Sequence, residues 1–249
     1  PGIHGRDAKR VEVIDLESDV FVYDVVKNEM VSCPLLSKKE SFETFPSFSA
    51  DGKTLYFCTA NSRPIPDEYN QIRYNLCSIA FDPASRTFGN QVDTLFAAEA
   101  MGKSVSFPRP SYDGKYLMFT LSEYGNFSIW HKEADLWLTD LTTRQSRPLT
   151  EVNSNDVESY HNWSSNSRWF VFSSRRIDGL YTRPYIAGID AQGKVTKPFL
   201  LPQKDPDDYI RSFYSYNLPE FVTGPVTVNP RDLAAAAMNP ERKQVKAGR

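Results

Sequence analysis

The segment HKEAD, from His131 to Asp135, contains residue types that can bind a divalent metal. His131, Glu133 and Asp135 stand at positions i, i+2 and i+4, which share one face if the segment is extended. An imidazole and two carboxylates suit zinc or manganese. A polar loop that leads into a strand is the commoner origin of such a segment. We therefore predict no cofactor and keep a divalent metal as the alternative.

A second polar segment could supply oxygen ligands. Asn155, Asp156 and Glu158 carry amide and carboxylate oxygens of the kind that calcium prefers, although a polar connection between strands explains them equally. The sequence contains no Gly-x-Ser-x-Gly elbow, no His-Glu-x-x-His and no glycine-rich phosphate loop. Because nothing marks a nucleophile that His161 could activate, we predict no catalytic residue.

Aromatic and arginine residues gather in and beside the long polar segments of the chain. Tyr, Trp and Arg provide large contact areas at low entropic cost and dominate binding hot spots. The same residues can stack on sugar rings, so the predicted partner is a protein or a glycan. Packing between strands is the alternative role for the aromatic residues. The predicted binding residues are Arg109, Trp130, His131, Tyr160, His161, Arg175, Arg176, Tyr181 and Arg183.

The bulk composition argues against a nucleic-acid partner and against a transmembrane segment. The chain has 249 residues, 40% of them hydrophobic, and a formal net charge of −2. This charge gives no basic footprint for a phosphate backbone, so we predict no nucleic-acid partner. No apolar run approaches the roughly 20 residues that span a bilayer, so we predict no transmembrane segment in this chain.

The cysteines give little information on function. Cys33, Cys58 and Cys77 match no zinc-binding or redox spacing. Free buried thiols are the expected state. A cross-strand bridge between Cys58 and Cys77 is the alternative, which requires an oxidising compartment.

An internal repeat provides the elements that position these residues. Three stretches align: FPSFSADGKTLYFCTA from Phe45, FPRPSYDGKYLMFTLS from Phe107 and YHNWSSNSRWFVFSSR from Tyr160. Each predicts a short strand, a tight turn and a buried strand. The turns are formed by Asp-Gly pairs in the first two copies, which tolerate positive φ, and by Asn166-Ser167 in the third.

A second half-motif follows each copy and completes a unit of four strands. It consists of a strand that ends in Asp82, Asp140 or Asp190, a polar turn and another strand. Another copy, with Asp24 at the matching place, stands at the front of the chain. Four-stranded units of this kind predict an all-β fold, a β-propeller of antiparallel blades of which about three and a half are present.

The predicted organisation is a partial propeller over residues 1–227 and a C-terminal helix and tail over 228–249. Asn229 as N-cap and Pro230 at the first helical position predict the helix, and the basic tail after it is expected to be solvated. Within the propeller we expect a half-blade at 18–36, blades at about 45–97, 107–150 and 160–202, and a closing segment at 203–227.

The repeat core, aromatic–Pro–x–(Phe/Pro)–Ser–x–Asp–Gly–Lys–x–Leu–x–Phe, resembles the WD-like propeller repeat of TolB-type proteins over about 18–202. The same repeat occurs in the propellers of prolyl-oligopeptidase-type peptidases. The segments SSRRIDGLYTRPYIA, KPFLLPQ and YNLPEF also resemble the C-terminal part of TolB-like lipoproteins of Bacteroidetes-type bacteria. The resemblance implies a propeller fold and a setting in the periplasm or on an outer-membrane lipoprotein, and the aromatic and arginine residues then favour a non-catalytic module that binds a partner.

The alternative function is that of a hydrolase part, either a gating propeller of the prolyl-oligopeptidase type or a metal-dependent hydrolase or lyase. A propeller of three and a half blades does not close into a ring. We expect upstream sequence or a second chain to supply the missing blades, or an open array that the tail caps, with 203–227 returning toward the first half-blade.

The predicted binding surface is the face that carries the long loops. The loops at 61–73, 122–134 and 175–183 emerge beside the connections between blades, whereas the tight turns lie on the opposite face. Binding sites tend to lie on such elaborated loops. We expect Arg109 and His161 to begin innermost strands and to point toward the channel mouth on this long-loop face.

Overall fold

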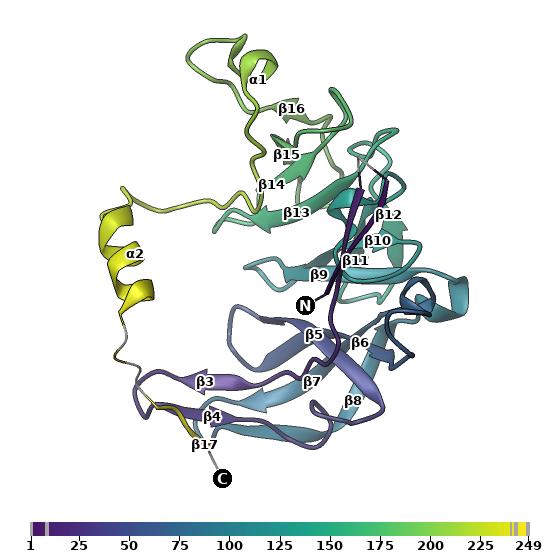
Figure 1. Ribbon diagram of the computed structural model, residues 1–249, viewed down its shortest axis with the longest axis vertical. Helices are drawn as coiled ribbons and strands as arrows, with labels where there is room; N and C mark the ends of the chain where they lie inside the picture. Colours follow the sequence, from purple (N-terminus) through teal and green to yellow (C-terminus); the bar gives the residue numbers. More distant parts are fainter. Residues whose placement is uncertain (1, 8–9, 240, 242–243, 248–249) are drawn as a thin grey trace.

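The computed structural model of the chain describes residues 2–7, 10–239, 241 and 244–247, with side chains for 13–239, 241 and 244–246. Within this part, three four-stranded antiparallel sheets are arranged in an arc (Figure 1). Each sheet pairs its strands in chain order, as a propeller blade does. The predicted fold class, a partial β-propeller, is confirmed.

The three sheets follow one another along the chain. The first contains β5 (Ser41–Phe48), β6 (Thr54–Asn61), β7 (Asn75–Asp82) and β8 (Thr87–Phe96). The second contains β9 (Ser104–Pro110), β10 (Tyr116–Ser122), β11 (Asp135–Asp140) and β12 (Ser146–Pro148). The third contains β13 (Glu158–Trp163), β14 (Trp169–Ser174), β15 (Arg183–Gly188) and β16 (Phe199–Leu200). The first strands β5, β9 and β13 contact one another in that order and form the inner side of the arc.

Shorter elements surround the sheets. The strands β1 (Gly2–Asp7) and β2 (Arg10–Ile14) form a separate antiparallel pair. Three short 3₁₀ turns lie in the connections: η1 (Tyr69–Gln71), η2 (Glu99–Met101) and η3 (Ser128–Trp130). The helices are α1 (Asp208–Arg211) and α2 (Pro230–Met238).

The half-blade at the front of the chain is paired with the end of the chain. The strands β3 (Val22–Asp24) and β4 (Glu29–Val31) are antiparallel, and β17 (Lys246–Ala247) adds to β4 in parallel. The Lys246 N–H donates to the Asn28 carbonyl at 3.0 Å. The tail is predicted to be solvated, and its described side chains are exposed, but its backbone is paired with the half-blade. The edge of β4 offers unpaired backbone groups, and the tail pairs with them. Arg242, Lys243, Gly248 and Arg249 lie outside the described residues.

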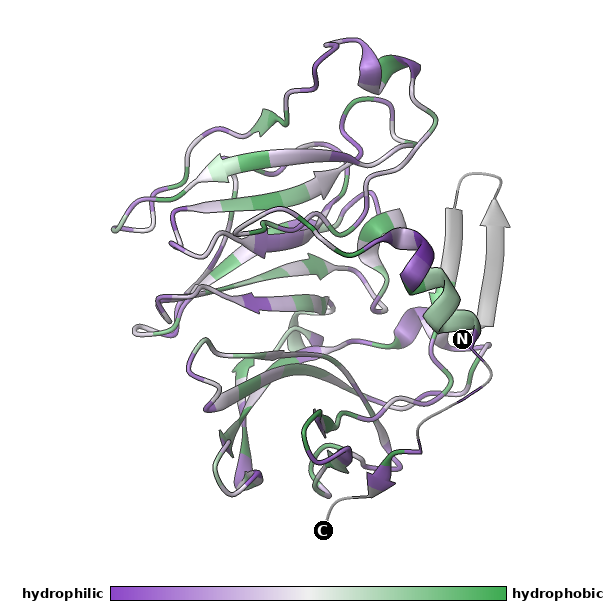
Figure 2. Ribbon diagram, turned by 90° about the vertical axis from the view of Figure 1, so that its left-hand side faces the viewer, coloured by the Kyte–Doolittle hydropathy of each residue, from purple (hydrophilic) through white to green (hydrophobic). Residues whose placement is uncertain are grey.

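The helix α2 lies on the open side of the arc, between the third sheet and the half-blade (Figure 1). Figure 2 views this side and shows hydrophilic residues at the beginning of α2 and hydrophobic ones toward its end. The Asn229 side chain accepts a hydrogen bond from the Arg231 N–H, and Pro230 occupies the first turn, as the sequence predicts. No residue of α2 is buried. The return to the half-blade is thus made by the chain after α2 and not by 203–227.

The tight turns of the sheets follow the predicted chemistry. Gly52 and Gly114 adopt φ of 71° and 70°, a region that favours glycine. In the third repeat Ser167 takes the same place with φ of 56°, and Asn166 Oδ1 accepts a hydrogen bond from the next-but-one N–H. The same Asx hydrogen bond is made by Asp51 and Asp113 in the first two repeats, so the turn is kept although serine stands in place of glycine.

A bulge in each innermost strand changes the predicted strand bounds. Phe45, Phe107 and Tyr160 adopt φ of 52°, 54° and 52°, and each lies where its strand shifts register against its neighbour. These aromatic residues lie inside the strands and do not begin them. The prediction that Arg109 and His161 begin innermost strands is therefore wrong. Arg109 is the last residue but one of β9.

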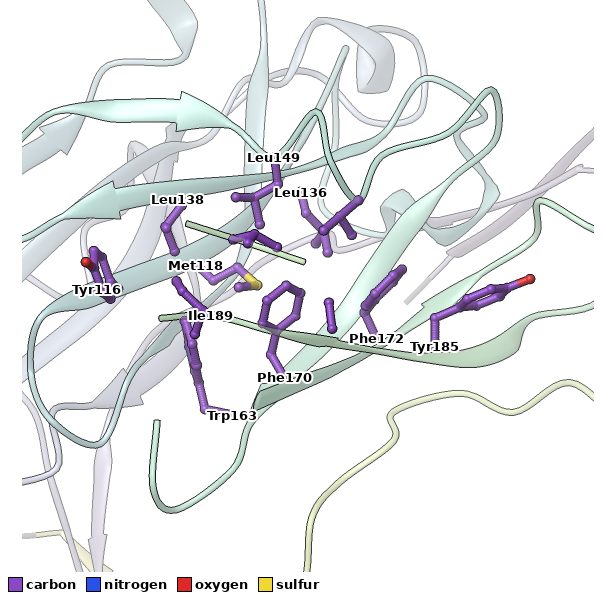
Figure 3. Close-up of a cluster of buried hydrophobic side chains, with 13 residues drawn as sticks. Tyr116, Met118, Leu136, Leu138, Leu149, Trp163, Phe170, Phe172, Tyr185 and Ile189 are labelled. Carbon is purple, nitrogen blue, oxygen red and sulfur yellow. The ribbon is translucent and has the colours of Figure 1, made fainter. Parts of the chain in front are cut away.

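The core between the second and third sheets consists of interdigitated apolar side chains (Figure 3). Met118 from β10 and Leu136 and Leu138 from β11 face Phe170 and Phe172 from β14, and all are buried. All residues of β10 are buried, and successive ones belong to different layers: Met118 to this core, and Leu117 and Phe119 to the core on the other side of the sheet. Each sheet is thus held by contacts with its neighbours.

The cysteines are free thiols. In the pair formed by β6 and β7, Cys58 lies opposite Leu76 and Cys77 lies opposite Phe57. The two thiols therefore point to opposite faces of the sheet and belong to different apolar clusters. The alternative of a Cys58–Cys77 bridge is wrong for this reason.

Replacement of Phe170 tests the contribution of the inter-sheet core. The substitution F170A leaves a cavity in a closely packed layer and is expected to lower the free energy of unfolding by about 3–5 kcal/mol. The control V26A changes a side chain that is 95% exposed and is expected to change it by less than about 0.5 kcal/mol. Urea unfolding measures both, and equal losses would contradict the assignment.

Candidate functional site

The long-loop face is built around Arg183, a side chain only 1% exposed. Its guanidinium donates hydrogen bonds to the carbonyls of Tyr209 at 2.7 Å and Ser212 at 2.9 Å, and also to that of Tyr214. The rings of Tyr181 and Tyr209 lie 5.2 and 5.7 Å from it. Arg183, predicted as a binding residue, therefore holds the segment 209–214 against the third sheet.

Two further predicted binding residues also have internal partners. The guanidinium of Arg175 lies 4.1 Å from the centre of the Trp130 ring, and its Nε donates to the Leu180 carbonyl at 3.0 Å. The guanidinium of Arg176 lies 2.9 Å from a Glu158 carboxylate oxygen. These internal contacts hold the 175–183 loop in place. They leave the two guanidinium groups few N–H donors for a binding partner.

The Glu158 side chain is completely buried, so the groups that donate hydrogen bonds to its carboxylate all belong to this chain. The hydroxyls of Ser154 and Ser174 each donate to the carboxylate at 2.7 Å, beside Arg176. Burial raises the pKa of Glu158, and these donors oppose the shift. The proposed calcium group does not converge, because this carboxylate is occupied and Asp156 Oδ1 accepts from the Val157 N–H.

The HKEAD segment, the alternative metal site, does not have the extended conformation that this alternative requires. The Ala134 N–H donates to the His131 carbonyl, so the segment folds into a turn. His131 Nδ1 lies 3.4 Å from Glu133 Oε1. Burial opposes ionisation of Glu133, but the contact with His131 lowers its pKa to about 2. No group of three His, Cys, Asp or Glu residues able to hold a metal occurs in the described part of the chain.

An exposed apolar surface lies above Arg183. Phe213 is 82% exposed and Ile210 is 78% exposed, and the Phe213 ring lies 6.2 Å from that of Tyr181. We use the name loop-face patch for the exposed residues Ile177 and Leu180 of the 175–183 loop and Ile210, Phe213 and Tyr214 of the segment 209–214, together with the half-buried Tyr181 that contacts Phe213. Its backbone is fixed by the hydrogen bonds from Arg183 and Arg175.

Arg109, Tyr160 and His161 are brought together on the inner side of the arc. They line a small cavity, the axial pocket, whose other walls are Phe107, Asn162, Leu218, Pro219 and Glu220. An open groove of about 280 Å³ adjoins it and is lined by Ser47, Phe48, Ala50, Arg109, Pro110, Tyr112, Asn162 and Glu220. Since Phe48 and Pro110 end their strands next to the tight turns, the groove lies at the tight-turn end and not at the predicted long-loop face.

His161 is buried within the axial pocket. The side chain is 2% exposed, and burial, together with the charge of Arg109, lowers its pKa to about 3, so the imidazole is neutral at pH 7. Neither ring nitrogen has a hydrogen-bond partner among the described residues, although the backbone of Met118 and Phe107 lies close enough to oppose the shift.

The predicted binding residues thus do not form one site. Some support the long-loop face, and others line the axial pocket. The axial pocket also contains Asn162 and the segment Leu218–Glu220, which the sequence analysis missed. A coil segment carries no periodic signal, and no local pattern relates residue 220 to residue 109. Within the described residues, no helix is long and apolar enough to cross a membrane.

No protein family and no curated protein matches the chain. Similar solved structures include TolB from Acinetobacter baumannii, which is 19% identical over 71% of this chain and 36% of that one, with a TM-score of 0.45. Another is the β-propeller domain of the Trilobed protease from Pyrococcus furiosus, with 15% identity, 67% and 44% coverage and a TM-score of 0.40. A third is putative TolB from Agrobacterium tumefaciens, with 14% identity, 73% and 69% coverage and a TM-score of 0.35.

These neighbours are TolB-type and peptidase propellers, and the likeness concerns the fold alone. The chain spans about a third of the length of the Acinetobacter TolB structure that it matches.

Removal of the Arg176 side-chain charge tests its internal role. The substitution R176M leaves the Glu158 carboxylate buried without its cation, and we expect a loss of about 3–5 kcal/mol in the free energy of unfolding at pH 7. The double substitution R176M/E158Q is expected to recover part of this loss, because no buried charge is left. A loss below about 1 kcal/mol for R176M would contradict a structural role.

Asp135 makes stability depend on pH. Burial, with the charge of Glu158, raises the pKa of Asp135 to about 6. A raised carboxyl pKa favours the folded state below pH 4, and this contribution is lost as the pH rises through 6. Relative to D135N, the wild type should lose about 1 kcal/mol between pH 4 and pH 7, after allowance for solvent screening of a half-exposed group. If the difference in the free energy of unfolding between the wild type and D135N is the same at pH 4 and pH 7, this prediction is wrong.

Proposed function

We propose that this propeller module is non-catalytic and binds a protein partner through the loop-face patch. The observation that carries the proposal is an exposed set of aromatic and aliphatic side chains on a backbone fixed by the buried Arg183. Apolar side chains in water gain about 25 cal/mol for each Å² that a partner covers. Because Arg183 already orders the segment 209–214, less conformational entropy is lost on binding.

The composition of the patch favours a protein over a glycan. Phe213 and Tyr214 could stack on a sugar ring, but Ile177, Leu180 and Ile210 have no flat face and no hydrogen-bonding group. Aliphatic side chains beside aromatic ones are the usual composition of the central part of a protein interface. The arginines beneath the patch are engaged in internal contacts, so the surface itself is mainly apolar.

The setting of the module belongs to the same proposal. The resemblance of the repeats supports a periplasmic or outer-membrane lipoprotein context.

Peptide selection tests the proposed binding surface. Random peptides displayed on phage are selected against the purified chain, and the affinities of recovered peptides are measured by fluorescence polarisation. We expect peptides rich in apolar residues, whose affinity for F213S/Y214S is at least tenfold lower, about 1.4 kcal/mol. The control V25S/V26S changes two exposed residues of the half-blade and should leave the affinity unchanged.

Two results would overturn the proposal. If no peptide is enriched, or if the selected peptides bind F213S/Y214S as tightly as the wild type, the patch is not a protein-binding surface. If a glycan array instead yields a ligand whose binding is lost in F213S/Y214S, the partner is a carbohydrate.

A further inference from the structure

Arg109 carries a positive charge that nothing in the described part of the chain neutralises by contact. It is half-buried in β9, and no hydrogen bond or ion pair of its guanidinium occurs among the described residues. Burial lowers the pKa of Arg109, and the charge of Glu220 opposes this shift. The guanidinium groups of Arg175, Arg176 and Arg183, in contrast, each make hydrogen bonds or ion pairs within the chain. The five N–H donors of this guanidinium therefore have no partner among the described residues, beside the axial pocket that Arg109 lines.

His161 provides a second and independent indication of a ligand. It lines the same pocket, is almost completely buried, and has two ring nitrogens without a hydrogen-bond partner in the described residues. Burial of an unpaired polar group lowers stability, and most such groups in folded proteins are paired. A neutral imidazole can donate one hydrogen bond and accept another.

The donors of the pocket fit a carboxylate. The Asn162 side-chain oxygen accepts from the Trp163 N–H at 2.8 Å, which leaves its amide N–H groups free to donate toward a ligand. Arg109, Asn162 and His161 can thus present N–H groups to one anion. A single guanidinium matches a single negative charge, and its planar fork matches the two oxygens of a carboxylate.

The chain itself brings a carboxylate to this place. The segment Leu218–Glu220, which we call the strap, lines one side of the pocket, whose free volume is only about 10 Å³. Glu220 lines both the pocket and the adjoining groove, and its charge acts on Arg109 without closing to an ion pair. In the groove Phe48 and Tyr112 are partly exposed and offer apolar contact beside the charge.

We propose that the axial pocket and its groove bind an acidic side chain of an extended peptide segment from a partner protein, and that the strap occupies the pocket when the partner is absent. The partner's carboxylate takes the place of Glu220 at Arg109, and its neighbouring apolar residues cover Phe48 and Tyr112. This inference concerns a surface other than the loop-face patch and does not depend on it.

The strap sequence supplies the probe for a test. The capped peptide Ac-NLPEF-NH₂ has the sequence of residues 217–221 and is titrated into the chain by calorimetry, with the His161 ring followed by ¹⁵N NMR. In E220Q the internal competitor has lost its charge, so the peptide should bind at least fivefold more tightly than to the wild type. The ring signals of His161 should shift on binding.

Matched controls separate the parts of the proposal. The peptide Ac-NLPQF-NH₂ should bind at least tenfold more weakly, and R109Q/E220Q should lose binding of Ac-NLPEF-NH₂. R109K/E220Q keeps the charge without the fork and should bind with intermediate affinity. Thermal unfolding must show that each variant is folded, and F213S/Y214S should bind the peptide as the wild type does.

Each possible failure has a defined meaning. Equal affinity for the glutamate and glutamine peptides, or no binding to E220Q at millimolar peptide, would overturn the carboxylate site. Equal affinity of the wild type and E220Q would overturn the role of the strap. Loss of peptide binding in F213S/Y214S would show that the peptide binds the loop-face patch instead.

Discussion

The positive φ shared by Phe45, Phe107 and Tyr160 is the constraint on which the inner side of the arc depends. This backbone region costs a residue with a Cβ about 1–3 kcal/mol, and three consecutive sheets adopt it at the same repeat position. The rings offset the strain by mutual contact, because their centres lie 4.2 Å and 4.9 Å apart along the series. The same bulges shift the strand register and so decide where Arg109 and His161 lie.

Much of the fold could be predicted from the sequence because its signals are local. Each tight turn is marked by Asp-Gly or Asn-Ser, and each strand beside it by a short apolar run, so four-stranded units follow from neighbouring residues. The bounds of the innermost strands could not be predicted in the same way. The residue type of Phe107 or Tyr160 gives no sign of a positive φ, so the aromatic residues were expected to begin the strands and not to interrupt them.

The candidate site was less predictable because arginine partners are not local. Arg175, Arg176 and Arg183 have the residue type of a binding surface, yet their donors are directed to backbone carbonyls and to one buried carboxylate. The carbonyl is common to all residues, so no sequence pattern identifies it as a partner. Exposed apolar residues on top of these arginines, such as Phe213, are what the internal contacts leave for a partner.

His161 shows why a departure from a repeat is informative. The first two repeats have Pro46 and Pro108 at this position, and proline has no N–H and no polar side chain that burial could leave unpaired. An imidazole at the same place is buried beside Arg109 with both nitrogens unpaired in the described structure, which lowers stability without improving the packing. A role in packing alone does not account for this pair of residues. The ligand that we propose for the axial pocket would account for both residues, and in the present structure the charge of Glu220 acts on Arg109.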